Sequence, residues 1–374
     1  MRGVGAEFAR REVVAHLQQW EDDESIPRAL HVAAAQQGLL GVGFPEEVGG
    51  QGGTLLDSLD VAEGMFAAGA SSGLMAGLFT SGIALPHLVA DWAARGETDL
   101  VDRFVRPTLA GELIGSLAVT EPGGGSDVAG IRTTARRQGE RYVVNGAKTL
   151  ITSGVRADFV TTAVRTGGPG HGGLSLLVVE RGTPGFTVDR SLPTMGWHCS
   201  DTAELSFLDA LVPVANLLGA ENTGFYQLAE QFVGERIGLA VHAYGIAGRA
   251  LELSVEHCRR RETFGRALID NQVVAHTLVE MRRQVEVART YVRHVAERYV
   301  AGQDVVAEAC LAKQTACEAA TYVCDRAVQL HGGAGYLHGT EVERHYRDAR
   351  ILPIGGGATE VLTDLAATLL GYTS

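Results

Sequence analysis

The spacing of hydrophobic residues changes twice along the chain, and these changes limit the folds that the chain can adopt. From the start to about Leu113, apolar residues recur at helical spacing. Between about Ile114 and Val212, short β-branched runs alternate with Gly, Pro, Asn and Asp, which is typical of a mostly antiparallel β domain. From about Gly224 the helical spacing returns, in long segments joined by short loops that favour an antiparallel bundle.

This pattern predicts an α+β protein of several domains, which suits a length of 374 residues at roughly 100–200 residues per domain. We expect an N-terminal helical domain over 1–113, a middle antiparallel β-barrel or sandwich domain over 114–222, and a C-terminal four-helix bundle over 223–374. The strand-length runs of the middle domain are RYVVN, TLITS, DFVTTAVRT, LSLLVVE, GFTVDR and AELSF.

Composition and charge exclude several classes of function. A formal net charge of −12 disfavours a non-specific grip on nucleic acid. No stretch approaches the roughly 18 apolar residues that a membrane-spanning helix needs. The first residues, MRGVGAEFARREVV, are charged and lack the apolar core of a signal peptide. We therefore expect a cytoplasmic protein with no nucleic-acid partner and no membrane span.

The five cysteines indicate neither a disulfide framework nor a metal site. Their number is odd and no C-x-x-C pair occurs. Cys310, Cys317 and Cys324 are spaced by seven, so they share one stripe of a helix and are expected to be buried small hydrophobes. No Cys/His cluster has metal-ligand spacing, and we expect no metal.

Three segments far apart in the sequence carry chemical signals, each weak alone. In LAVTEPGGGSDVAGIRTTARRQGERYVVNGAKTLITSG, the run Gly123–Gly125 would let backbone N–H groups approach a flat or anionic ligand, but it is equally a loop between strands. RRRETFGRALIDNQ has three arginines that suit either the negative end of a helix or a pyrophosphate. In VQLHGGAGYLHGTEVERHYRDARILPIGGGATEV, a helix ends in a glycine turn and a second glycine run precedes another helix.

Together, in this order and within an α–β–α plan, the segments resemble the acyl-CoA dehydrogenase family of FAD-dependent flavoproteins. The resemblance covers essentially the whole chain, and its specific marks are TEPGGGSD with NGAKTLITSG, RRETFG, and LHGGAGY followed by RDAR. It implies FAD as cofactor, an acyl-CoA thioester as substrate and an electron-transfer flavoprotein as electron acceptor. It also implies an obligate homo-oligomer, commonly a dimer of dimers, because in relatives one subunit reaches the FAD of its neighbour.

The resemblance also implies site residues. Contacts to FAD are expected from a strand and its loop, from a second strand, from positions near the adenosine half and from positions after the catalytic loop: Leu117, Val119, Thr120, Gly125, Ser126, Leu150, Ile151, Thr152, Gln329, Gly333, Thr359 and Glu360. Contacts to the FAD of a neighbouring subunit are expected from Arg261, Thr263, Phe264 and Gln272. Substrate contacts are expected from Ser126, Arg236 and Gly357.

The catalytic base is where this sequence departs from many relatives. The implied reaction gives a trans-2-enoyl thioester: a base takes the α proton and flavin N5 accepts the β hydride. Many relatives carry a glutamate in the loop after RDAR, but here Gly356 stands at that position. Relatives of the long-chain and isovaleryl branches carry it on a C-terminal helix before an arginine, and Glu235-Arg236 matches that place.

We therefore expect Glu235 to be the base, although a surface Glu-Arg pair would look the same in sequence. Its neighbours are apolar, and a dry surrounding would raise its pKa towards that of a general base. Gly356 would keep a backbone role, its N–H polarising the thioester oxygen.

Other functions remain compatible with the sequence. The thioester could be carried by an acyl-carrier protein in a biosynthetic pathway, and relatives with this fold can act as oxygen-using oxidases or monooxygenases. A non-enzymatic alternative is a scaffold that has lost catalysis, with Gly356 as the one feature in its favour. The helical position of the base favours long or branched acyl groups, whereas chain length itself is not readable from the sequence.

Overall fold

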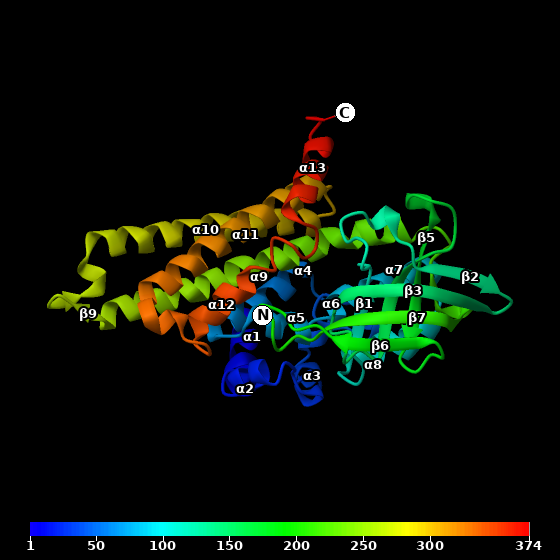
Figure 1. The fold of residues 1–374 in the computed structure, drawn as a ribbon, viewed down its shortest axis with the longest axis horizontal. Helices are drawn as coiled ribbons and strands as arrows, with labels where there is room; N and C mark the ends of the chain where they lie inside the picture. Colours follow the sequence, from blue (N-terminus) through cyan, green and yellow to red (C-terminus); the bar gives the residue numbers. More distant parts are fainter. Residues whose placement is uncertain (374) are drawn as a thin grey trace.

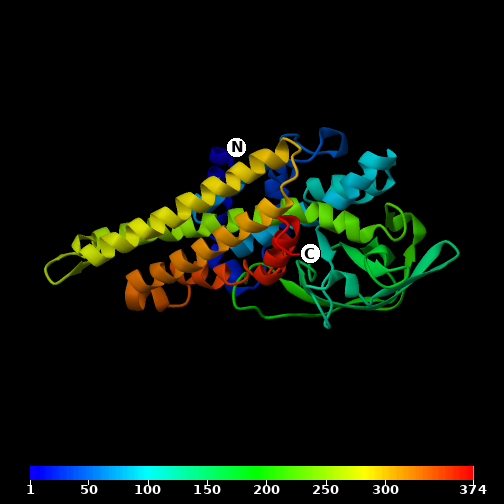
Figure 2. The same cartoon turned by 90° about the horizontal axis from the view of Figure 1, so that it is seen from above.

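The computed structural model describes residues 1–373, which form a helical body with a β domain at one end. Figures 1 and 2 both show the long C-terminal helices running lengthwise, with the β domain at one end and a short hairpin, labelled β9 in Figure 1, at the opposite tip. The N-terminal helices pack beside the long helices, where these approach the β domain.

The N-terminal part consists of short helices, several of them ended by local sequence signals. Thr54 and Asp57 form a capping box at the start of α4, and Gly69 ends that helix with φ of +108°. The helices are α1 (Arg2–Phe8), α2 (Leu17–Asp22), α3 (Arg28–Gln36), α4 (Leu55–Ala68), α5 (Ser72–Leu78), α6 (Ser81–Ala84), α7 (Pro86–Arg95) and α8 (Arg106–Leu109).

The middle part is an eight-stranded sheet in which most neighbours are antiparallel. Its order is β6-β7-β3-β2-β4-β5-β8, and β1 pairs with β4 in parallel, as β2 does over a short stretch. The strands are β1 (Gly115–Ala118), β2 (Thr134–Gln138), β3 (Arg141–Thr152), β4 (Phe159–Arg165), β5 (Leu174–Glu180), β6 (Phe186–Ser191), β7 (Thr202–Pro213) and β8 (Leu217–Leu218).

Strands β4 and β5 are buried on both faces, which explains why they read as continuous apolar runs. On one face Phe159 and Leu176 join a core with the N-terminal helices, and on the other Val160 and Leu177 join the core inside the β domain. The β domain therefore shares a hydrophobic core with the N-terminal helices.

The C-terminal part is built on three long helices that pack on one another, as the returning helical spacing predicts. They are α9 (Gly224–Arg260), α10 (Gln272–Val300) and α11 (Val306–His331). A small hairpin of β9 (Glu262–Thr263) and β10 (Arg266–Ala267) joins α9 to α10. Two shorter helices, α12 (Glu341–Ala349) and α13 (Thr359–Leu369), pack on α11.

The predicted α+β class and its order are confirmed, with one local correction. RYVVN and TLITS were expected as separate strands, but RYVVN and the first four residues of TLITS lie in the single strand β3, which pairs with β7 through two irregularities in register. Loops join α8 to β1 and β8 to α9. The domain boundaries at 113/114 and 222/223 lie in these loops and stay predictions.

Candidate active site

Glu235 lies on α9 with a half-buried side chain, and within residues 1–373 no group donates a hydrogen bond to its carboxylate. Burial raises the pKa of Glu235, whereas the nearby charges of Arg236 and Lys313 act in the opposite direction. The carboxylate is thus free to accept a proton and more basic than that of an ordinary glutamate.

Gly356, in the loop between α12 and α13, lies directly against Glu235. A Cβ on Gly356 would lie 3.4 Å from Oε1 of Glu235 and 2.3 Å from Cδ1 of Leu239. Its φ is +65° and that of Gly357 is +102°, a backbone that glycine adopts without strain. Among the described residues its N–H has no acceptor. An unpaired backbone donor and a carboxylate therefore lie next to each other.

Lys313 of α11 joins this group, although the sequence reasoning missed it. Its Nζ donates hydrogen bonds to the carbonyl oxygens of Gly355 (2.6 Å) and Gly357 (2.8 Å), on either side of Gly356. A signal was present: Lys313 stands three residues after Cys310 and four before Cys317, on the stripe of α11 that is buried. The predicted burial of the cysteines is confirmed.

Arg236 is buried beside Glu235, and the protein does not provide acceptors for all of its hydrogen-bond donors. Its guanidinium carbon lies 5.9 Å from the centre of the Phe232 ring. In the described part of the chain, its Nε has no hydrogen-bond partner. Because buried donors in native proteins normally have a partner, this N–H is available to a bound group.

The glycine-rich loop after β1 is anchored by a buried ion pair. Lys148 of β3 donates to the carbonyl oxygen of Val119 and to Oε1 of Glu121, both at 2.9 Å. Burial opposes the charge of Glu121, but Lys148 and the donors at Arg132 and Thr133 outweigh it, so the pKa of Glu121 lies below its ordinary value. Burial lowers the pKa of Lys148 to about 8.

Beyond this anchor the loop leaves room for a ligand. A Cβ on Gly123 or Gly124 would meet no atom within 4 Å, and Gly125 and Ser126 are exposed. Leu150 of β3 is 60% exposed, with φ of +59°. An exposed leucine beside an open glycine loop suits a flat, partly apolar group such as a flavin.

The other flavin contacts predicted for this end of the molecule differ in how exposed their side chains are. The partly accessible ones are Leu117, Val119, Thr120 and Thr152. Ile151 is buried in the β-domain core, so its side chain is not available to a ligand. Thr359 and Glu360 begin α13, next to the loop that carries Gly356. The open loop and the exposed Leu150 are compatible with bound FAD.

The remaining predicted positions lie far from Glu235 in the same chain. Arg261, Thr263 and Phe264 lie at the tip of the bundle around β9, and Gln272 begins α10 there (Figure 1). Phe264 is fully exposed. Gln329 and Gly333 lie at the end of α11 and are exposed. Within one chain the structure therefore does not bring these positions to the Glu235 site.

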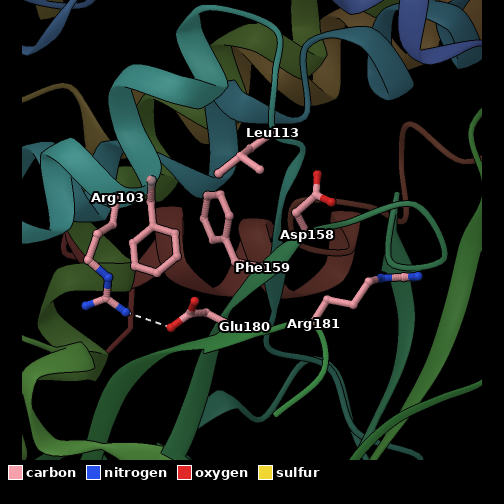
Figure 3. A pocket seen from close by; sticks show the side chains of 7 residues that line it. Arg103, Leu113, Asp158, Phe159, Glu180 and Arg181 are labelled. Atoms are coloured by element: carbon pink, nitrogen blue, oxygen red, sulfur yellow. Dashed lines mark hydrogen bonds and ion pairs between the residues drawn. The ribbon is translucent and has the colours of Figure 1, made fainter.

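A separate cavity of about 420 Å³ lies between the N-terminal helices and the sheet (Figure 3). Its walls contain none of the predicted site residues, and its charged side chains have partners within the protein: Arg181 donates to the carbonyls of Ala157 and Val155, and the others form ion pairs. Arg103 binds Glu180 at 2.6 Å, and Arg28 binds Asp158 at 2.6 Å. We therefore do not assign the reaction to this cavity.

The described residues were also compared with the requirements of a metal site and of a membrane-spanning helix. The described residues contain no group of three or more His, Cys, Asp or Glu side chains that could hold a metal ion. None of the helices within residues 1–373 is long and apolar enough to cross a membrane.

Comparison with known proteins identifies the family to which this fold and site belong. The acyl-CoA dehydrogenase N-terminal, middle and C-terminal domain models match residues 1–112, 116–210 and 222–370. The chain belongs to the acyl-CoA dehydrogenase family and is an FAD-dependent oxidoreductase that acts on CH–CH groups.

Three relatives show how far the similarity extends. A crystal structure of a putative acyl-CoA dehydrogenase from Mycobacterium smegmatis is 58% identical, with a TM-score of 0.98 over 100% of this chain and 97% of that one. The mitochondrial long-chain specific acyl-CoA dehydrogenase of Rattus norvegicus is 36% identical over 96% of this chain and 83% of its own length. An acyl-CoA dehydrogenase of Bacillus subtilis is 36% identical over 96% and 94%, respectively.

Proposed function

We propose that the protein oxidises an acyl-CoA thioester to the trans-2-enoyl thioester, with Glu235 as the base that removes the α proton. The observation that carries this proposal is the position of the Glu235 carboxylate, 3.4 Å from where a side chain on Gly356 would begin. A carboxylate from the helix thus stands at the loop position where many relatives have their glutamate. This chain therefore has one carboxylate at the site, Glu235 from the helix, and none at loop position 356.

Three features of the chain support the base role. Burial raises the pKa of Glu235, so its carboxylate binds a proton more tightly than an exposed one. Its oxygens have no hydrogen-bond donor within the described residues and can receive the proton directly. Leu239, one turn further along α9, covers the Gly356 backbone and helps to exclude water from the same place.

The α proton of a thioester becomes acidic only when its oxygen is polarised by fixed donors. The unpaired N–H of Gly356 is such a donor, in a backbone that is left-handed at both Gly356 and Gly357. Arg236 offers a second unpaired N–H at its Nε. We assign substrate contacts to Arg236, Gly357 and Ser126 on the family pattern.

FAD, when bound, supplies the acceptor for the β hydride at its N5 atom. The residues that would hold it in this chain are those around the open loop and the end of β3: Leu117, Val119, Thr120, Gly125, Ser126, Leu150, Ile151 and Thr152. Thr359 and Glu360 would contact it from α13. Because Arg261 and Phe264 lie beside β9, which is at the far tip (Figure 1), they would reach the FAD of a second copy, with Thr263, Gln272, Gln329 and Gly333.

We further propose a homo-oligomer and an electron-transfer flavoprotein as the acceptor of the electrons. The remote, fully exposed Phe264 supports the oligomer, because a flavin contact at that tip has meaning only between copies. A long or branched acyl group fits the helical base. The printed name of the rat relative, long-chain specific, supports the same substrate class.

The test is anaerobic bleaching of the bound flavin by acyl-CoA. Glu235→Gln should remain yellow but lose bleaching by more than about 1000-fold, because the amide cannot accept the proton. The matched control is Glu252→Gln, the same change at an exposed position of the same helix, which should bleach normally. Undiminished bleaching by Glu235→Gln would refute the assignment.

The same assay separates the substrate classes. Straight and branched acyl-CoAs from C4 to C16 and an acyl-carrier-protein thioester would be compared with the wild-type protein. We expect the fastest bleaching with long or branched acyl-CoA. Faster bleaching with the carrier-protein thioester would overturn the acyl-CoA assignment, and a colourless purified protein would overturn the enzymatic proposal as a whole.

A further inference from the structure

The chain uses lysine at only two positions, against 30 arginines. Both lysines are buried, Lys148 at 0% exposure and Lys313 at 1%. Lysine is rarely buried completely, because removing its ammonium group from water is costly. Each lysine anchors one loop of the candidate site. Lys148 binds the carbonyl of Val119, and Lys313 binds the loop that contains Gly356. Lys313 is the one that lies near Glu235.

Lys313 reaches the loop from a stripe of small residues on α11. Ala309, Cys310, Ala316 and Cys317 are buried around it. Their short side chains leave space for the long lysine to extend towards the loop. Its Nζ ends on two carbonyl oxygens and has a third proton to offer. The site for an ammonium group is therefore built into the packing of α11.

The two carbonyls belong to a turn that backbone hydrogen bonds close at its two ends, from Gly355 to Ile351 (2.8 Å) and from Thr359 to Pro353 (3.1 Å). Gly356 and Gly357 both have positive φ, and this turns the carbonyls of Gly355 and Gly357 towards α11. In the described part of the chain, the N–H of Gly356 has no backbone or side-chain partner. The direction of that N–H thus depends on how the carbonyls on either side are held.

Lys313 and Glu235 also influence each other electrostatically. The positive charge of Lys313 lowers the pKa of Glu235, in the same direction as Arg236 and against burial. Burial lowers the pKa of Lys313, while Cys317, Glu235 and Cys310 act to raise it and Arg236 acts to lower it. These are the charged and titratable groups that face the pair from α9 and α11.

We propose that Lys313 is a positioning residue for the reaction: it holds the Gly355–Gly357 turn against α9 and places its positive charge near the Glu235 carboxylate. The proposal rests on the proposed function of Glu235. Lys313 does not contact the substrate in this proposal, but it affects two properties of the site: the direction of the Gly356 N–H and the pH at which the base works. A purely structural anchor would affect only the first.

The first experiment compares the rate of anaerobic flavin bleaching against pH in three variants. Lys313→Met removes the charge and both hydrogen bonds, and Lys313→Arg keeps the charge. The matched control is Gln314→Leu, which removes a neutral anchor from the same helix to the start of α13, at the carbonyl of Thr359 and the hydroxyl of Thr363. FAD content and thermal stability are measured for each variant.

Lys313→Met should shift the acid limb of the rate profile upwards by about one pH unit, the order expected for loss of one nearby charge. Its rate on that limb should fall at least about tenfold. Lys313→Arg should keep the limb near its wild-type pH, and Gln314→Leu should lower stability without moving it. An unshifted limb in Lys313→Met would overturn the proposal.

A second measurement does not depend on Lys313→Met folding or on activity. With two lysines in the chain, lysine labelled at its side-chain carbon gives two NMR signals, and the Lys313 signal can be titrated in wild type and in Glu235→Gln. Loss of the Glu235 charge should lower the pH at which Lys313 loses its proton. An unchanged titration would overturn the proposed coupling, whereas full bleaching by Glu235→Gln would instead overturn the proposed function.

Discussion

Replacement of Gly356 by alanine tests the geometry on which the base assignment depends. The backbone at Gly356 has φ of +65°, and its Cβ would lie 2.3 Å from Cδ1 of Leu239. A left-handed backbone costs an L-residue about 1–2 kcal/mol. Moving Leu239 away from a favoured rotamer costs about 1 kcal/mol more. We expect Gly356→Ala to lower the free energy of unfolding by about 2–3 kcal/mol.

The two contributions can be measured separately by urea unfolding of the FAD-bound protein. Gly139 is a matched control, since its φ is +59° and a Cβ there would meet no atom within 4 Å. Gly139→Ala should therefore show the backbone cost alone. In a Leu239→Ala background, adding Gly356→Ala should lower the free energy of unfolding by the backbone cost only, because the collision with Leu239 is gone. The reasoning fails if Gly356→Ala costs no more than Gly139→Ala.

The same geometry predicts that a carboxylate can be moved from the helix to the loop. In Glu235→Gln, adding Gly356→Glu should restore part of the flavin bleaching, because the new side chain begins 3.4 Å from the lost oxygen. Restoration should improve when Leu239→Ala removes the obstructing methyl group. No bleaching in this triple variant, with FAD bound and the fold intact, would show that the two positions do not serve one α carbon.

Two further predictions concern buried charges elsewhere in the fold. Lys148→Met should lower the free energy of unfolding by about 3–5 kcal/mol in urea, because it leaves Glu121 buried without its partner; a loss below 1 kcal/mol would contradict the role of this pair. Burial and the neighbouring Glu21 raise the pKa of Asp348 from 3.8 to about 6. Stability from protonated Asp348 is therefore present below about pH 4 and lost as the pH rises through about 6, so Asp348→Asn should gain up to about 3 kcal/mol relative to wild type between pH 4 and 7. A pH-independent difference between the two proteins would contradict this prediction.

The long elements could be predicted from sequence because their own spacing determines them. Helices α9 to α11 read clearly, since their apolar stripes are sustained over many turns. Strand β3 was divided wrongly, because its interruptions are local and the strand continues only through pairing with β7. Leu150, with positive φ within that strand, is held by tertiary context that no local propensity reveals.

The site could be predicted only in part, for a physical reason. The positions of Glu235 and Gly356 followed from the family pattern, but their contact depends on how α9 packs against a loop more than a hundred residues later. Lys313 carried no motif at all. A lysine on a stripe of small buried residues conflicts with its surroundings, and such a conflict between local chemistry and burial is a sign of function that can be read from sequence.

The packing also explains why a base on α9 requires a glycine in the loop. Leu239 and Glu235 occupy one face of α9, and a side chain at position 356 would collide with the first and approach the second. A regular helix fixes the direction of its carboxylate through its own backbone hydrogen bonds. The turn at Gly356 is closed by backbone bonds on either side, from Gly355 to Ile351 and from Thr359 to Pro353, but the N–H of Gly356 itself has no acceptor among the described residues. Lys313 adds an anchor from α11, at the carbonyl oxygens on either side of Gly356. The helical glutamate, the glycine and the buried lysine thus form one arrangement, and changing any of them alone should disturb the other two.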